Sequence, residues 1–257
     1  MLKDNDYINA WDNKLIHKNL QNLFIPKNTE EAYKLQSNYQ AYSKYDLFGW
    51  KIAATSIEGQ EHIGVHSPIA GRLIKERLYK SGDNVSLISN QMKVAEAEFS
   101  FKLNTDIPKK NIPYTYEEVL DCIEHICPAI EIPDSRFLNF DKIGKDLLIA
   151  DNACAGEYVL GNNPTKSWKH INLKNFKVGC YKNNQLVGHG IGSNVLEDPI
   201  IALSWLINEL NSYNITLYSG QTILTGTCIK PITVAEGDNI VMDFYELGKV
   251  DCHFSST

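Results

Sequence analysis

Residues 94–101 constrain the fold of this chain more than any other segment, because they read Val-Ala-Glu-Ala-Glu-Phe-Ser-Phe. Successive side chains of a strand point to opposite faces, so this alternation predicts a strand with one apolar face in a core. Glu96 and Glu98 share the other face. Two carboxylates on one face repel each other, and both are costly to bury unless they are paired.

A third acid, Glu131, stands in the middle of a second short apolar run at 128–132. A hard divalent cation such as Mg²⁺ or Mn²⁺ would relieve both the repulsion and the cost of burial. A solvated strand face is the alternative for an isolated Glu-x-Glu pair. Because three acids are each isolated in strand-like apolar sequence, we favour a metal site with the ligands Glu96, Glu98 and Glu131.

The composition is that of an ordinary globular protein, with 43% hydrophobic and 22% charged residues in a chain of 257. A net charge of -6 without a basic stripe argues against nucleic-acid binding. The N-terminus is polar and acidic, unlike a signal peptide, and no apolar run reaches transmembrane length. The six cysteines form no C-x-x-C pair, which indicates reduced thiols and no structural zinc. We therefore expect a cytoplasmic protein that binds neither nucleic acid nor membrane.

The first fifty residues predict two helices. Apolar residues recur at helical spacing in the first, at Ile8, Trp11, Leu15 and Leu20. Asn28 is the predicted N-cap of the second helix, with Glu31 at the capping-box position. A buried strand at 48–54 then carries one lysine, Lys51, and the polar residues 55–66 predict a mobile loop or a short helix.

From about residue 70 the pattern changes to strands. We expect them at 72–79, 85–88, 94–103, 129–137, 158–160, 176–182, 185–190, 222–224, 239–246 and 249–254. One helix is predicted from Thr115 through Ile123 and Ile126, and another starts at Asp198, which is followed by proline. The chain lacks regular βαβ alternation, so the pattern indicates an α+β fold with antiparallel or mixed sheet.

Several polar residues outside the acids are candidates for chemistry. Lys51 either extends to the surface or is buried beside a counter-charge, and three nearby carboxylates favour a buried, substrate-facing lysine. The small residues at 151–156 include Cys154, for which no neighbouring histidine supports a thiolate nucleophile. Thr225 and Gly226 end an apolar strand, either as a plain turn or as groups that face a ligand oxygen.

Three further residues have structural alternatives. Arg136 is expected to pair with Asp134 or with the cluster of three acids, and a structural salt bridge with Asp134 is favoured. His62 and His66 lie in the polar loop, either as surface residues or as acid–base groups that arrive when the loop closes over a site.

Taken together, these segments resemble the fumarylacetoacetate hydrolase superfamily, in particular the 2-keto-4-pentenoate hydratases and the related decarboxylases. The resemblance rests on Gly-Trp-Lys-Ile at 49–52, Ile-Gly-Val at 63–65, Glu-Ala-Glu at 96–98, Ala-Ile-Glu-Ile-Pro-Asp-Ser-Arg at 129–136, Asp-Asn-Ala at 151–153 and Ile-Leu-Thr-Gly at 223–226. Each motif alone is weak, but six in register from about residue 8 to the end are specific for the superfamily.

The resemblance implies a mixed β-sandwich roll at 71–257, the catalytic domain, after a smaller helical and α+β part at 1–70. It implies Mg²⁺ or Mn²⁺ on Glu96, Glu98 and Glu131. Lys51 falls on the active-site lysine, and Thr225 in a segment near the bound keto acid. Substrates would be small 2-oxo acids, and a metal on such an acid stabilises the enolate that hydration, C–C hydrolysis and decarboxylation share.

Two departures alter the expected proton chemistry. Ile69 stands where the hydratases place an aspartate that partners the lysine, and Cys154 replaces a serine after Asp-Asn-Ala. His66 is a candidate to supply the missing acid–base group, since histidine suits that work near neutral pH. We therefore expect a hydratase-like lyase that forms a homodimer or a larger homo-oligomer, with Cys154, Thr225 and Gly226 lining the substrate. A decarboxylase, an acylpyruvate-type hydrolase or a non-catalytic keto-acid binder are the alternatives.

Overall fold

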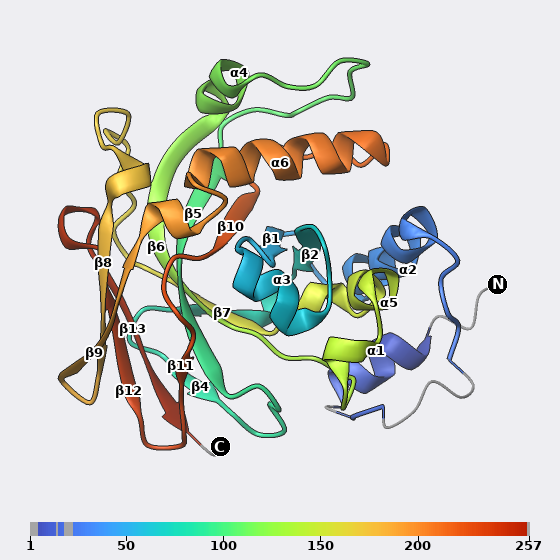
Figure 1. Ribbon diagram of the computed structural model, residues 1–257, viewed down its shortest axis with the longest axis horizontal. Coiled ribbons are helices and arrows are strands. Elements are labelled where there is room, and N and C mark those ends of the chain that lie inside the picture. Colours follow the sequence, from blue (N-terminus) through green and yellow to red (C-terminus); the bar gives the residue numbers. More distant parts are fainter. Residues whose placement is uncertain (1–4, 14, 18–22, 256–257) are drawn as a thin grey trace.

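The computed structural model describes residues 5–13, 15–17 and 23–255, which form two β-sheets with helices against them (Figure 1). The larger sheet has the strand order β2-β1-β10-β5-β6-β7-β3, and β11 pairs with β5 outside this path. Its strands are β1 (Gly49–Ala53), β2 (Ile69–Leu73), β3 (Leu78–Lys80), β5 (Val94–Leu103), β6 (Ile123–Ile132), β7 (Glu157–Leu160), β10 (Thr222–Thr227) and β11 (Ile232–Thr233). The smaller sheet has the order β4-β13-β12-β8-β9. Its strands are β4 (Asn84–Ser86), β8 (Lys177–Lys182), β9 (Gln185–Ile191), β12 (Asn239–Asp243) and β13 (Lys249–Ser255).

Six α-helices lie against these sheets in the described part of the chain: α1 (Asn5–Asp12), α2 (Thr29–Tyr42), α3 (Ile57–Ile63), α4 (Tyr116–Asp121), α5 (Lys145–Ala150) and α6 (Pro199–Ser212). Figure 1 shows α1, α2 and α5 together at one end of the molecule, with the smaller sheet at the other end. The long helix α6 packs against β10 and α4. Within the residues described, no helix is both long enough and apolar enough to cross a membrane.

The central strand β5 has the bounds and the facing that its sequence predicts. Its alanines and phenylalanines, Ala95, Ala97, Phe99 and Phe101, are completely buried in the main core. The strand pairs with β6 in antiparallel register, which places Glu96 opposite Glu131. This register brings the isolated acids of two apolar runs to one place.

The mixed α/β architecture agrees with the predicted class, but the first seventy residues do not stand apart from the sheet. β1 pairs with β10 in parallel and with β2 in antiparallel register. Strands on both sides of residue 70 therefore belong to one sheet. The division into parts at 1–70 and 71–257 stays a prediction, as does the sandwich roll.

Several capping and turn predictions are confirmed. Asn28 accepts a hydrogen bond from the Glu31 N–H, although the Glu31 carboxylate accepts from Lys27 and not from the cap. Thr115 forms a complete capping box with Glu118. Asp198 caps α6 by accepting a hydrogen bond from the Ile200 N–H, as its place before a proline predicts. The hairpin residues Asn183 and Asn184 have φ of 51° and 65°, which is typical of a tight turn between strands.

Other boundaries are wrong. The first helix ends at Asp12, where the Leu15 N–H bonds to the Ala10 carbonyl in a wide terminal turn; Leu15 is exposed, and Leu20 lies outside the described residues.

The helix from Thr115 ends at Asp121. The residues Ile123 and Ile126 belong instead to β6, because pairing with the buried strand β5 overrides their helical spacing. The predicted strand at 129–137 stops at Ile132 because Pro133 has no N–H for the ladder. The predicted strand at 72–79 is two strands, β2 and β3, separated by a 3₁₀ turn at Lys75–Arg77.

Candidate functional site

The three predicted acids converge on one face of the β5–β6 pair. One carboxylate oxygen from each of Glu96, Glu98 and Glu131 lies within 4.8 Å of the others. Glu98 is completely buried, Glu131 is 1% exposed, and Glu96 is half-buried. Oxygen atoms at this separation suit a small hard cation, which holds its ligands at about 2.0–2.6 Å.

The cluster strongly disfavours three negative charges. Burial, and then the charges of Glu131 and Glu96, raise the pKa of Glu98 well above its usual value. Burial and the Glu131 charge raise the pKa of Glu96 to about 7. The Lys51 ammonium opposes both shifts but does not outweigh them. One lysine is therefore too little positive charge for this set of acids.

Several carboxylate oxygens also lack donors. Oε2 of Glu131 and Oε1 of Glu98 are buried without a hydrogen bond, and Oε1 of Glu131 has only an ion pair with Lys51 at 3.0 Å. Oε2 of Glu98 accepts from the Gly226 N–H at 2.8 Å. Buried carboxylate oxygens normally have partners, and unpaired ones cost free energy. Excess negative charge and oxygens without donors both fit a divalent metal ion. The three glutamates are therefore suitable ligands for Mg²⁺ or Mn²⁺.

Lys51 is buried on the same site and does not extend to the surface. It is 2% exposed, its Nζ lies 3.0 Å from Oε1 of Glu131, and the ammonium donates to the Ala153 carbonyl at 3.1 Å. Burial alone would lower the pKa of Lys51, but the charges of Glu131, Glu96 and Glu98 raise it above its usual value. The group stays a cation at neutral pH.

The contact between Lys51 and Glu131 spans several strands of the larger sheet. Lys51 is on β1 and Glu131 on β6, and β10 and β5 lie between them. Neighbouring strands are about 4.8 Å apart, so in a flat sheet these strands would be separated by about 14 Å. The 3.0 Å ion pair therefore places both side chains on the same face of the sheet, and a sheet that curls toward this face favours the contact.

Comparisons with known proteins agree with this arrangement. No family model matches the sequence. The chain is 33% identical over 211 residues to a 2-hydroxyhexa-2,4-dienoate hydratase from Comamonas testosteroni, covering 81% of this chain and 78% of the relative. It is 31% identical over 241 residues to a 2-keto-4-pentenoate hydratase from Paraburkholderia xenovorans, covering 92% and 88%.

The chain belongs to the 2-keto-4-pentenoate hydratase branch of the fumarylacetoacetate hydrolase superfamily.

A solved member of this superfamily has the same fold. The structure of 4-oxalocrotonate decarboxylase from Pseudomonas putida G7, complexed with magnesium and adipate, superposes with a TM-score of 0.86 at 26% identity. The match covers 98% of this chain and 95% of that one. The likeness in fold thus extends over nearly the whole chain.

The segment at 151–154 contributes contacts that the sequence did not reveal. Asp151 is completely buried and binds Arg136 through Nε at 2.7 Å and the Ser135 hydroxyl at 2.7 Å. The predicted pairing of Arg136 with Asp134 is therefore wrong; Asp134 accepts from the Gln91 N–H instead. Arg136 is 4% exposed, so its partner had to be an equally buried acid, and Asp151 meets that condition.

Cys154 lies close to this site as a neutral thiol. It is 3% exposed, and burial raises its pKa to about 12. The nearby Asp151 charge acts in the same direction, whereas Lys51 opposes it. A thiolate nucleophile is therefore disfavoured here, and the role of Cys154 as a residue that lines the substrate stays a prediction.

Thr225 and Gly226 are on β10, beside the cluster. The Thr225 hydroxyl is completely buried and donates to the Phe99 carbonyl, so it holds β10 against β5. The Gly226 N–H orients Glu98, at a φ of +97° that favours glycine. An added Cβ would lie 2.2 Å from Oγ1 of Thr55. Their predicted contact with substrate remains untested, and what the structure gives them is a role in positioning the acid.

Ile69 and the two histidines of the polar loop lie in different surroundings. Ile69 is completely buried at the start of β2, opposite Ala53 in the ladder with β1. His66 is exposed in the turn before β2, and His62 is exposed on α3, where its ring contacts Phe140. The structure does not bring either histidine to the acids, so an acid–base role for His66 depends on movement of its segment.

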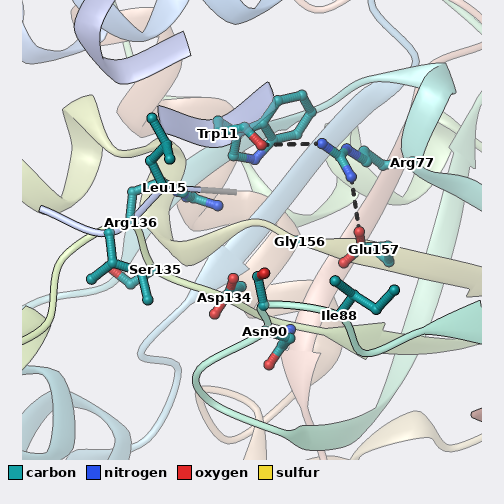
Figure 2. Close-up of a pocket in the computed structure, with 12 residues that line it drawn as sticks. Trp11, Leu15, Arg77, Ile88, Asn90, Asp134, Ser135, Arg136, Gly156 and Glu157 are labelled. Carbon is teal, nitrogen blue, oxygen red and sulfur yellow. Dashed lines mark hydrogen bonds and ion pairs between the residues drawn. The ribbon is translucent and has the colours of Figure 1, made fainter. Parts of the chain in front are cut away.

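A surface pocket lies apart from the acids (Figure 2). Its lining includes Trp11, Arg77, Asp134 and Glu157, and none of the four residues Lys51, Glu96, Glu98 and Glu131. Arg77 already pairs with Glu157 at 2.9 Å and donates to the Trp11 carbonyl, as the dashed lines show. We place the functional site at the carboxylate cluster, since charges in the pocket are already satisfied.

Proposed function

We propose that this protein is a metal-dependent hydro-lyase that adds water to a small 2-hydroxydienoate, as its hydratase relatives are named to do. The observation that supports this most directly is the set of three buried carboxylates beside a buried lysine. Mg²⁺, or Mn²⁺ in its place, is the proposed ion, because the available ligands are carboxylate oxygens.

Glu96, Glu98 and Glu131 would hold the ion. Once bound, it would supply a Lewis acid for the carboxylate and keto oxygens of a 2-oxo acid. Gly226 fixes the orientation of Glu98 through its N–H, and Glu131 also neutralises Lys51. Glu96 is the most exposed of the three acids, so substrate and water would reach the ion from its side.

Lys51 is proposed to hold the substrate or to pass it a proton. In the metal-free site the neighbouring carboxylates raise the pKa of Lys51 above its usual value, so Nζ can donate a proton or attract a substrate carboxylate there. Because Lys51 and Glu131 are almost fully buried, their charges act in a medium of low polarity and orient a ligand strongly.

A decarboxylase acting on the same scaffold is the second candidate. The residue that favours it is Ile69, which puts a buried apolar side chain where the resemblance leads us to expect an aspartate. Release of CO₂ from a 2-oxo acid needs negative charge to be stabilised but needs no water at the carbon, so loss of an acid–base group harms it less.

The test is turnover of 2-hydroxypenta-2,4-dienoate and of 4-oxalocrotonate with Mg²⁺ or Mn²⁺. Loss of diene absorbance with water added supports a hydratase, and CO₂ release supports a decarboxylase. Lys51→Met should lower turnover by about 10²–10⁴-fold and still bind metal. Metal and oxalate binding with no turnover of either substrate would leave only a keto-acid binder.

We also propose that the 29.0 kDa chain assembles into a homodimer or a larger homo-oligomer. The exposed apolar residues Leu15, Ile16 and Ile88 all line the surface pocket, where a second copy would cover them. Sedimentation velocity tests this, and a single species at the monomer mass over the micromolar range would contradict it.

A further inference from the structure

Lys51 has two polar partners, and they differ in kind. The Glu131 carboxylate at 3.0 Å is also one of the proposed metal ligands, so its charge is shared. The Ala153 carbonyl at 3.1 Å belongs to the backbone. Among the described side chains, only Lys51 donates a hydrogen bond to it. The long lysine side chain has many rotamers, so the direction of this carbonyl decides where the ammonium is held.

The carbonyl comes from an unusual turn. Asn152, Ala153 and Cys154 have φ of 62°, 52° and 58°, three consecutive left-handed residues, none of them glycine. Side chains with a Cβ disfavour this region, and asparagine tolerates it best. Such strain persists only where the surrounding structure holds it in place.

Asn152 provides that restraint through its side chain. Its Oδ1 accepts from the Arg72 N–H at 2.7 Å, and its Nδ2 donates to the Arg72 carbonyl at 2.9 Å. The completely buried side chain thus binds both backbone groups of one β2 residue, as a neighbouring strand would. These two bonds fasten the turn to β2.

The place of attachment lies directly beside Lys51. In the β1–β2 ladder Lys51 is opposite Gly71, the residue before Arg72. Registered residues of an antiparallel pair project to the same face, and Gly71 has no side chain there. The Asn152 carbonyl occupies that space, since a Cβ on Gly71 would lie 2.3 Å from it. The missing side chain lets the turn reach the lysine.

We propose that Asn152 is a positioning residue for the catalytic lysine: its two bonds to Arg72 hold the left-handed turn that directs the Ala153 carbonyl at Lys51 Nζ. The expected effect of Asn152 on turnover rests on the proposed function. Its expected effect on the position of Lys51 does not. It assigns a role to Asn152 that does not require contact with the substrate or the metal.

The test compares Asn152→Gly with Asn184→Gly. Glycine adopts left-handed φ freely, so each substitution keeps the backbone conformation accessible and removes only the side chain. Asn184 is also left-handed but exposed in the β8–β9 hairpin, outside the site. We expect Asn152→Gly to lower kcat by about 10- to 100-fold with KM and Mn²⁺ affinity changed less than about threefold, and Asn184→Gly to change neither.

A second variant, Gly71→Ala, disturbs the same turn from β2. Gly71→Ala should push away the Asn152 carbonyl and lower kcat in the same way, with Asn152 itself intact. Wild-type kcat in Asn152→Gly would overturn the proposal, and so would an equal loss of Mn²⁺ affinity, which would indicate general damage to the site.

A crystal structure of Asn152→Gly tests the positioning role of Asn152 separately from the proposed function. We expect Lys51 Nζ to leave the Ala153 carbonyl while the three glutamates stay in place. If wild type turns over no 2-oxo acid, the proposed function fails, but displacement of Nζ would still support the positioning role. An unmoved Nζ would refute that role whatever the activity.

Discussion

At the scale of single residues, Glu96, Glu98 and Glu131 place more negative charge in a small buried volume than Lys51 can neutralise. The pKa of Glu98 stays well above its usual value, and that of Glu96 is about 7, despite the nearby ammonium. Oxygens of Glu98 and Glu131 lack donors as well. The cluster is therefore costly without a cation and is best explained as a site built to bind one.

Replacing a single acid should weaken metal binding. We expect Glu96→Gln and Glu131→Gln each to lower Mn²⁺ affinity by at least tenfold, because one anionic ligand of three is lost. Isothermal titration measures the affinity, with Glu117→Gln on the exposed face of α4 as a matched control. If both site variants stay within about threefold of wild type, roughly 0.7 kcal/mol, these glutamates are not the ligands.

A second prediction at the scale of residues concerns Ile69 and His66. With Ile69 in place of an acid, hydratase turnover of wild type should be weak, and Ile69→Asp should raise it by tenfold or more, since a general acid or base contributes about 10²–10⁴-fold. Ile69→Asn has a similar shape without the ionisable group and should not raise it. If His66 supplies the proton, His66→Ala removes most of the remaining rate.

Strong hydratase turnover in wild type that His66→Ala leaves unchanged would contradict this account. It would mean that the proton comes from another group, with Lys51 the first to consider because its ammonium is protonated and beside the acids.

At the scale of elements, α3 lies between the strand that carries Lys51 and the strand that begins at Ile69. Ser56 caps its start, and Gly64 ends it at a φ of +70°, where an added Cβ would lie 2.2 Å from the Asp141 carbonyl. Thr55 at its base is 5% exposed, contacts Gly226 and accepts a bond from the Leu196 N–H. A movement of α3 would therefore reach the residue that orients Glu98.

We predict that residues 55–68 act as a lid that becomes more protected when ligand binds. The helix is short and largely exposed, which favours local opening. Hydrogen exchange with and without oxalate plus Mg²⁺ should show slower exchange in α3 and no change in the buried helix α6. Equal exchange of α3 in both states argues against a lid.

The sequence predicted some elements well because one local signal decided them. The alternation at 94–103 fixed β5, and capping residues fixed the starts of α2, α4 and α6. Predictions from sequence were wrong where a contact with a residue far along the chain determines the local structure. Ile123 and Ile126 have helical spacing but pair with β5, and nothing local in Asn152, Ala153 and Cys154 indicates three left-handed residues.

At the scale of the whole molecule, the site draws its residues from several strands of one sheet. Lys51, Gly226, Glu98 and Glu131 come from four adjacent strands, β1, β10, β5 and β6, and the side chains of the outer two strands meet across the strands between them. Sequence could name Lys51, Glu98 and Glu131 as candidates, because each is a charged residue within an apolar run. It could not show that the lysine of the first strand reaches the acid of the fourth.

Because the acids are in the core of this sheet, their ionisation should control the stability of the metal-free protein. Burial and Glu131 raise the pKa of Glu96 from 4.5 to about 7, so the folded state holds a proton that the unfolded state releases earlier. The contribution of Glu96 to the free energy of unfolding is then fully present below about pH 4.5. It is lost as the pH rises to about 7. Burial shifts the pKa of Glu98 in the same direction.

We therefore predict that the Tm of the metal-free protein falls by several degrees between about pH 5 and pH 8, since 1 kcal/mol corresponds to about 2–4 °C in a chain of this size. Glu96→Gln should flatten this fall, because an amide does not ionise. Mn²⁺ should reverse it, and more strongly at higher pH, because the ligands bind it deprotonated. Scanning calorimetry with chelator or with Mn²⁺ measures all three. A Tm that is constant or rises over this range in chelator, with Glu96→Gln matching wild type, would show that these acids are neither strained nor coupled to the fold as the structure indicates.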